Sequence, residues 1–180
     1  MRYYDYYDSP HGPMLLVASG AGLTGVYFEG QKYHARLEPQ WRADARHSPL
    51  RHAKRELAEY FAGERRRFET PLAADGTPFQ RAIWNAISTV AFGATITYGE
   101  LAARAGFAGS ARAAGAATGR NPITLIVPCH RIVGSNGSLT GYAGGLVRKR
   151  ALLALEGARP ESAARVLPLF GEHACPMQNA

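Results

Sequence analysis

The chain has 180 residues, of which 46% are apolar and 19% are charged. This composition excludes a disordered chain and allows one large or two small hydrophobic cores. No apolar run is long enough to span a membrane, and the N-terminus lacks a signal-peptide core, so we expect a cytoplasmic protein with no membrane partner.

The whole chain has a formal net charge of +7, and most of this positive charge lies in its second half. Residues 1–75 contain eleven Lys or Arg and ten Asp or Glu, whereas residues 76–157 contain eight and two. A local excess of this kind is typical of a surface that binds a polyanion such as DNA. An arginine-rich solvated surface would give the same count, so charge alone leaves both interpretations open.

The first sixty residues predict a small antiparallel sheet followed by a helix. Runs of β-branched and aromatic residues separated by Gly- and Pro-containing turns indicate strands at 3–7, 14–18 and 23–28. The helix is expected to start with Ser48 as its N-cap and Pro49 in its first turn, and to end before Gly63.

Two lobes are expected, separated by a linker at residues 71–76. Arginines 65–67, just before it, are interpreted as a solvated face, with DNA contact as the alternative. The predicted division of the chain is an N-terminal α/β domain, a C-terminal domain that carries the excess positive charge, and a tail, at residues 1–73, 74–160 and 161–180.

The second lobe is predicted to be mostly helical. The capping boxes Thr77–Gln80 and Thr97–Glu100 each indicate a helix start. The first of these helices carries an apolar stripe that we expect in the core, at Phe79, Ile83, Ile87 and Val90. The second ends near Gly106 and is followed by a helix at 111–118, and a last helix, expected to be apolar at Leu146, Leu152 and Leu153, covers 146–155.

The short helices on either side of Gly106 indicate a helix-turn-helix, although two packed helices in an ordinary core share this spacing. The second of them consists almost entirely of alanine and glycine, and Arg112 is its only long side chain. Ala113 and Gly115 permit close approach to a flat or grooved surface, which a helix reading bases in the major groove would not favour. Arg112, Ala113 and Gly115 are therefore candidates for contact with such a surface.

Cys129 follows an apolar run, 123–127, that predicts a buried strand ended by Pro128. Asn136-Gly137 then indicates a hairpin turn. The only other cysteine, Cys175, is expected to be a free thiol without function. Because there is no Cys-x-x-Cys pair and no metal-ligand spacing, we expect neither disulfides nor a metal site.

Three motifs around this cysteine carry a resemblance to a known family: Asn121-Pro122, Pro128-Cys129-His130-Arg131 and Gly141-Tyr142-Ala143-Gly144-Gly145. Together they resemble the active-site segment of the O6-alkylguanine-DNA alkyltransferases, the methylated-DNA–protein-cysteine methyltransferases, over about residues 77–156. The resemblance implies an α/β (α+β) fold of two lobes. The first would be a ribonuclease H-like antiparallel sheet with a helix, and the second a winged-helix-like domain containing the helix-turn-helix and the cysteine.

The activity implied by the resemblance is irreversible, stoichiometric transfer of an alkyl group from O6-alkylguanine in double-stranded DNA to Cys129. O4-alkylthymine is a further possible substrate. The base would be flipped out of the duplex from the minor groove, because O6 of a paired guanine is out of a thiol's reach. We expect no cofactor, and a monomer in solution that can bind cooperatively along DNA.

A cysteine becomes a good nucleophile as thiolate, which requires a nearby base or positive potential. His130 is the one histidine inside the motif segment. The resemblance implies that His130 accepts the thiol proton through a water and that Glu156 orients His130. It also implies that Tyr98 donates to guanine N3 and that Asn121 braces the backbone.

The resemblance also implies the base pocket and the way in which the duplex is held open. Arg112 would fill the gap left by the flipped nucleotide. Tyr142 would wall the pocket, with Gly144 beside it, and the carbonyl of Ile132 and that of the cysteine would accept from the guanine amino group. The backbone N–H of Ala143 would meet O6; many family members carry serine there, so we expect an altered tolerance for bulky alkyl groups at most.

Two alternatives remain at this stage. A non-catalytic sensor of alkylated DNA would flip the base and leave it intact, but known relatives of that type lack the cysteine. An unrelated thiol enzyme, such as a cysteine hydrolase, would turn over repeatedly and would need neither the helix-turn-helix nor Arg112.

Overall fold

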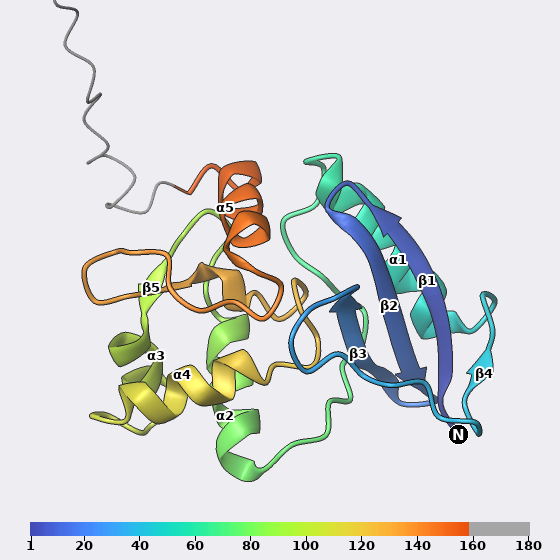
Figure 1. Ribbon diagram of the computed structural model, residues 1–180, viewed down its shortest axis with the longest axis horizontal. Helices are drawn as coiled ribbons and strands as arrows, with labels where there is room; N and C mark the ends of the chain where they lie inside the picture. Colours follow the sequence, from blue (N-terminus) through green and yellow to red (C-terminus); the bar gives the residue numbers. More distant parts are fainter. Residues whose placement is uncertain (159–180) are drawn as a thin grey trace, which may run out of the picture.

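A computed structural model describes residues 1–158, and Cys175 and the segment 161–180 lie outside the described residues. Figure 1 shows two lobes, one with a sheet and a long helix and the other built mainly from short helices. This is the mixed α/β, two-lobe architecture predicted from the sequence. No helix within residues 1–158 combines the length and the apolar character needed to traverse a bilayer.

The N-terminal sheet contains the three predicted strands in antiparallel order, β1 (Tyr3–Ser9), β2 (Gly12–Ser19) and β3 (Gly22–Phe28). A fourth strand, β4 (Arg42–Ala43), pairs parallel to β1 at the edge of the sheet. The sequence did not predict β4 because two residues are too few to show a strand period.

Helix α1 (Ser48–Phe61) packs against this sheet through a fully buried face and ends before Gly63, which has a positive φ of 78°. The prediction that Ser48 caps it was wrong: His47 is the N-cap residue, and no side chain caps this end by hydrogen bonding. A tertiary contact fixes the helix start instead. The His47 ring stacks on Tyr3 at 4.1 Å between centroids and hydrogen-bonds to the Ser19 carbonyl at 3.1 Å.

The C-terminal lobe contains the four predicted helices, namely α2 (Pro78–Ser88), α3 (Tyr98–Arg104), α4 (Ala111–Gly119) and α5 (Leu146–Leu155). Both predicted capping boxes are formed, at Thr77 and at Thr97. Helices α3 and α4 pack together across a short glycine-containing connection, as a helix-turn-helix requires. Of the apolar positions expected on α5, Leu152 and Leu153 are buried and Leu146 is 45% exposed, and α5 also buries Lys149.

Residues 123–127 are buried, but they form a tight turn and not the predicted strand. Leu125 has a positive φ of 75°, and the Val127 N–H donates to the Ile123 carbonyl at 3.0 Å. Pro128 is followed by a short 3₁₀ helix, η1 (Cys129–Arg131), which carries the cysteine. The run starts like a strand, because Ile123 pairs with Val26, but the positive φ of Leu125 then turns the chain back on itself. The side chain of Asn121 holds both ends of this turn through the Ile123 N–H and the Val127 carbonyl.

The predicted hairpin at Asn136-Gly137 is also absent. The turn exists, with Gly134 N–H donating to the Ser138 carbonyl at 2.9 Å, but Gly137 has a positive φ and Asn136 does not. The strand before it, β6 (Ile132–Val133), pairs in parallel with β5 (Ile96–Thr97) rather than with a returning strand. This pairing joins the end of η1 to the residues just before α3.

The two lobes share one hydrophobic core that includes residues of the sheet, α1 and the C-terminal helices. Val26 of β3 forms backbone hydrogen bonds to both sides of Ile123: its N–H donates to the Pro122 carbonyl at 2.8 Å, and its carbonyl accepts from Thr124 at 3.0 Å. The segment that leads to Cys129 is therefore fixed by the N-terminal sheet.

We expect Ile123→Ala to lower the free energy of unfolding by about 2–5 kcal/mol, because it opens a cavity where the lobes meet. Chemical denaturation would measure this change. Val147→Ala, at a position that is 83% exposed, is the control and should change stability by about 0.5 kcal/mol or less. Equal effects of the two substitutions would show that Ile123 is not part of the shared core.

Candidate active site

Cys129 is a buried cysteine whose sulfur is held by Asn121. The Asn121 side-chain nitrogen lies 3.2 Å from the Cys129 Sγ and donates to the Val127 carbonyl at 2.8 Å. The Asn121 side-chain oxygen accepts from the Ile123 N–H at 3.0 Å. One amide thus holds both sides of the turn before Cys129, which is the bracing position expected for Asn121.

Burial raises the pKa of the Cys129 thiol, and the hydrogen bond from Asn121 and the charge of Lys149 oppose this effect. The sulfur therefore rests as a thiol, and a base must take its proton before it reacts. Burial lowers the pKa of the neighbouring His130, so its imidazole rests neutral and can accept a proton.

His130 and Glu156 are brought together as predicted. His130 Nε2 lies 2.8 Å from the Glu156 Oε1, and both side chains are fully buried. Because the carboxylate can only accept, this contact assigns the imidazole proton to Nε2 and the lone pair to Nδ1. Nδ1 is buried and has no hydrogen-bond partner among the described residues, so it is the basic atom of the ring.

Glu156 also accepts from groups that the sequence did not indicate. Arg131 donates from Nε to Oε2 at 2.8 Å and from its terminal nitrogen to Oε1 at 2.9 Å, and Tyr60 of α1 donates to Oε1 at 2.8 Å. Burial would raise the pKa of Glu156, but the hydrogen bonds and charges of His130 and Arg131 outweigh it and lower the pKa to about 2. These contacts explain a carboxylate at the C-terminal end of α5, where the helix dipole disfavours it.

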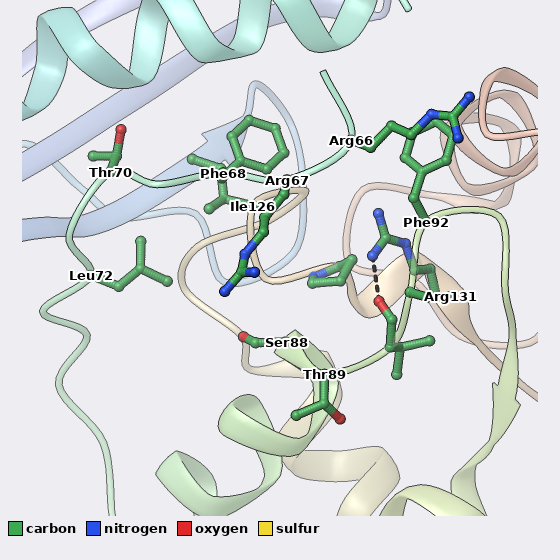
Figure 2. Close-up of a pocket in the computed structure, with 13 residues that line it drawn as sticks. Arg66, Arg67, Phe68, Thr70, Leu72, Ser88, Thr89, Phe92, Ile126 and Arg131 are labelled. Atoms are coloured by element: carbon green, nitrogen blue, oxygen red, sulfur yellow. Dashed lines mark hydrogen bonds between the residues drawn. The ribbon is translucent and has the colours of Figure 1, made fainter. Parts of the chain in front are cut away.

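Arg131 connects this carboxylate to the boundary between the lobes. Its remaining terminal nitrogen donates to the Val90 carbonyl at 2.6 Å, as drawn in Figure 2. Its outer side lines a pocket of about 670 Å³ together with Arg66 and Arg67. These two arginines are exposed, as interpreted from the sequence, whereas Arg65 is not part of a free solvated face because it forms an ion pair with Glu59 at 2.6 Å.

Tyr98, the first residue of α3, lies on the other side of the site. Its hydroxyl oxygen lies 3.3 Å from the carbonyl oxygens of both Thr140 and Gly141, so its single proton can be donated to either. Burial raises its pKa and outweighs the opposing effect of the hydrogen bond to Thr140, so the phenol stays protonated and able to donate.

Lys149 is a site residue that the sequence analysis missed. It is fully buried, and its Nζ donates to the carbonyls of Ile132 at 2.5 Å and Thr140 at 2.7 Å. Burial lowers its pKa to about 8, and the charge of Cys129 opposes this shift. Its helix has little amphipathic pattern, and lysine is rarely buried, so no sequence pattern marked Lys149 as a site residue.

The predicted pocket residues gather near this cluster. The Tyr142 ring meets His130 edge-on at 6.5 Å between centroids, and a Cβ at Gly144 would lie 2.7 Å from the Tyr142 ring. The absence of a side chain at Gly144 therefore leaves room for the Tyr142 ring. Ala143, half-buried, lies between them, and its carbonyl accepts from Lys32 at 3.0 Å.

The two carbonyls expected to receive the guanine amino group already have donors in the structure. The Ile132 carbonyl accepts from Lys149, and the Cys129 carbonyl accepts from the N–H of Ile132. Each carbonyl oxygen has two lone pairs, so each can accept a second hydrogen bond.

The predicted DNA-binding residues lie on α4. Arg112 and Ala113 are exposed, and Gly115 is half-buried. A Cβ at Gly115 would lie 3.6 Å from the Tyr98 ring, which places this part of α4 beside the residue expected to contact the base. The buried side of α4 consists of Ala114, Ala117 and Thr118.

Comparison with known proteins matches both lobes to one family. Residues 78–158 match the DNA-binding domain of 6-O-methylguanine DNA methyltransferase, and residues 2–74 match its ribonuclease-like domain.

Similar proteins have the same name in several organisms. The methylated-DNA–protein-cysteine methyltransferase of Methanosarcina acetivorans is 46% identical over 155 residues, covering 86% of this chain and 98% of the relative. That of Mycobacterium tuberculosis is 45% identical over 159 residues, covering 88% and 94%. The crystal structure of Mycobacterium tuberculosis OGT in complex with DNA superposes with a TM-score of 0.79 at 44% identity, covering 86% of this chain and 92% of that one.

We expect Glu156→Gln to lower the free energy of unfolding by about 3–5 kcal/mol at neutral pH, because it leaves the buried Arg131 without its counter-charge. Since the pKa of Glu156 falls from 4.5 to about 2 on folding, the stability it contributes is present above pH 4.5. That contribution is lost as the pH falls toward 2.

Denaturant unfolding at several pH values between 4.5 and 2 would measure this. Stability of the unsubstituted protein should decline more steeply across the window than that of Glu156→Gln. The exposed Glu64→Gln is the control and should keep the steep decline. Parallel declines in all three proteins would contradict the assignment of this pH dependence to Glu156.

Proposed function

The chain belongs to the 6-O-methylguanine DNA methyltransferase family, and we propose that its DNA repair by direct damage reversal is carried out by Cys129 within the cluster described above. The observation that carries the assignment is the buried Cys129 thiol, fixed by Asn121 and adjacent in sequence to the His130–Glu156 pair. The proposed substrate is O6-alkylguanine in double-stranded DNA, with O4-alkylthymine as a second substrate.

In the proposed reaction, Cys129 Sγ attacks the alkyl carbon on O6. The carbon–oxygen bond breaks as the carbon–sulfur bond forms, and the electron pair remains on the guanine. The thiol proton passes through a water to His130 Nδ1, while Glu156 stabilises the imidazolium that results. Tyr98 donates a hydrogen bond to guanine N3 and neutralises the charge on the departing base.

Transfer leaves a thioether on Cys129, and no group in the cluster offers a hydrolytic route that would remove it. We therefore propose that the protein reacts once and is consumed. Tyr142, Ala143, Gly144 and the carbonyl of Ile132 form the base pocket in this proposal.

DNA enters from the side of α4. The small residues Ala113 and Gly115 let the helix approach the minor groove, and Arg112 occupies the space left by the flipped nucleotide. Unstacking a base costs a few kcal/mol and costs least for a weakened pair, so alkylated guanine is favoured before any chemistry occurs. Contacts to phosphates make binding largely independent of sequence.

The remaining features of the proposal concern the whole chain. We propose that it acts in the cytoplasm as a monomer, with cooperative binding along DNA, and that its domains divide at residues 1–73 and 74–160. The non-catalytic sensor is not favoured, because the chain retains the cysteine and its relatives are named as methyltransferases. The cysteine hydrolase is excluded by family membership.

We expect excess duplex DNA carrying labelled O6-methylguanine to transfer about one label per protein, to the peptide that contains Cys129. Label counting and peptide mass mapping would establish both points. Cys129→Ala should retain binding of alkylated DNA and transfer nothing. Repeated turnover, or transfer by Cys129→Ala, would overturn the assignment of the nucleophile.

We expect Arg112→Ala to slow transfer from duplex DNA more than transfer from free O6-alkylguanine, because the side chain acts where a stack must be opened. Single-turnover rate constants on both substrates measure this. Arg150→Ala removes the same charge from the exposed side of α5 and should show a smaller loss on the duplex. Equal losses on duplex and free base would rule out the role proposed for Arg112.

A further inference from the structure

We propose that Tyr60 of the N-terminal lobe is a positioning residue for alkyl transfer, which sets the proton affinity of His130 through its hydrogen bond to Glu156. This inference rests on the proposed role of His130 as the base. It gives the N-terminal lobe a part in the chemistry of the C-terminal lobe.

Tyr60 reaches the active-site carboxylate from 96 residues away in the sequence. Its hydroxyl donates to the Glu156 Oε1 at 2.8 Å, and its side chain is fully buried. The same oxygen accepts from His130 Nε2 at 2.8 Å and from Arg131 at 2.9 Å. Three donors therefore share one oxygen atom, and the imidazole competes with the phenol for it.

Aromatic packing fixes the position of the Tyr60 hydroxyl. The ring contacts Phe61, Phe68 and Phe92, with centroids 5.3, 5.5 and 6.2 Å away. Phe61 lies on α1, Phe68 on the segment between the lobes and Phe92 after α2. Because the ring is held from three segments, the hydroxyl cannot leave Glu156 without moving the boundary between the lobes.

The Tyr60 hydroxyl keeps its proton at neutral pH and so remains a donor. Burial and the charge of Glu156 raise its pKa far above the usual value for tyrosine. A hydroxyl that keeps its proton can only donate to a carboxylate, and each donor reduces the negative charge available to the others.

This sharing has a direct consequence for His130. The hydrogen bond and charge of Glu156 raise the pKa of His130, against burial and the charges of Arg131 and Lys149, which lower it. The Tyr142 ring, which faces His130 edge-on, carries no charge because burial raises the pKa of its hydroxyl. By drawing charge away from Glu156, Tyr60 keeps His130 neutral to lower pH and so ready to accept the proton of Cys129.

The test is the pH dependence of the single-turnover rate constant for transfer from O6-methylguanine DNA. Tyr60→Phe keeps the ring and removes the donor, so the pKa of His130 should rise. The acidic limb of the pH–rate profile should therefore shift to higher pH by about 0.5–1 unit. On that limb the rate should fall about three- to tenfold, with little change on the plateau. Tyr7→Phe, which removes a hydroxyl beside Phe61 in the same lobe, is the control and should leave the limb in place.

A second variant works in the opposite direction and retains every contact. Replacing Tyr60 by 3-fluorotyrosine makes the phenol a stronger donor, so the acidic limb should move to lower pH. This variant keeps the proposal testable if Tyr60→Phe does not fold. Opposite shifts in the two variants support the proposal, whereas a uniform loss at all pH values would show that Tyr60 has only a structural role.

Nitrogen NMR of the His130 ring separates this inference from the proposed function, because it requires no chemistry. The Nε2–H signal should shift in Tyr60→Phe and stay in place in Tyr7→Phe. If it shifts while no protein transfers an alkyl group, the link from Tyr60 to His130 stands and the proposed function fails. An unchanged signal in Tyr60→Phe overturns the inference.

Discussion

A single buried carboxylate, that of Glu156, is the interaction on which the rest of the site depends. Removing a charge from water is costly unless donors compensate it, and Glu156 has donors from α1, from η1 and from the loop at Gly93. These elements are far apart in the sequence, so the carboxylate is compensated only when both lobes are folded together. The geometry of His130 is therefore a property of the whole described chain.

The same burial controls the reactivity of the cysteine. A thiol with a raised pKa in a water-poor site resists oxidation and adventitious alkylation, since these reactions require the thiolate. Asn121 and His130 provide a donor and a base at fixed positions, so the thiolate can form where the substrate carbon is presented. The charge of Lys149 also lowers the pKa of the Cys129 thiol and so favours the thiolate. The same side chain links the loop at Thr140 to the start of β6 through its two hydrogen bonds.

Local signals in the sequence predicted most of the local structure, and the errors came from unpredicted turns and from long-range contacts. The boxes at Thr77 and Thr97 predicted helix starts because a capping box involves only four residues. The run at 123–127 was misread because Leu125 adopts a positive φ and turns the chain back, which a pattern of apolar residues does not show. The pairing of His130 with Glu156 came from family resemblance, whereas Lys149 and Tyr60 looked like an ordinary surface lysine and an ordinary core aromatic.

The packed interior around Cys129 and the small side chains on the surface of α4 can both be understood from the proposed reaction, in which each protein molecule reacts once. An enzyme that turns over must let product leave its nucleophile, which favours an open or mobile site. In the proposed reaction the alkyl group stays on the sulfur and only the repaired DNA departs, so the cysteine can lie in a packed core held by Asn121. In the proposal, contact with DNA is made on the side of α4, where small residues and Arg112 would meet the duplex without displacing the sulfur.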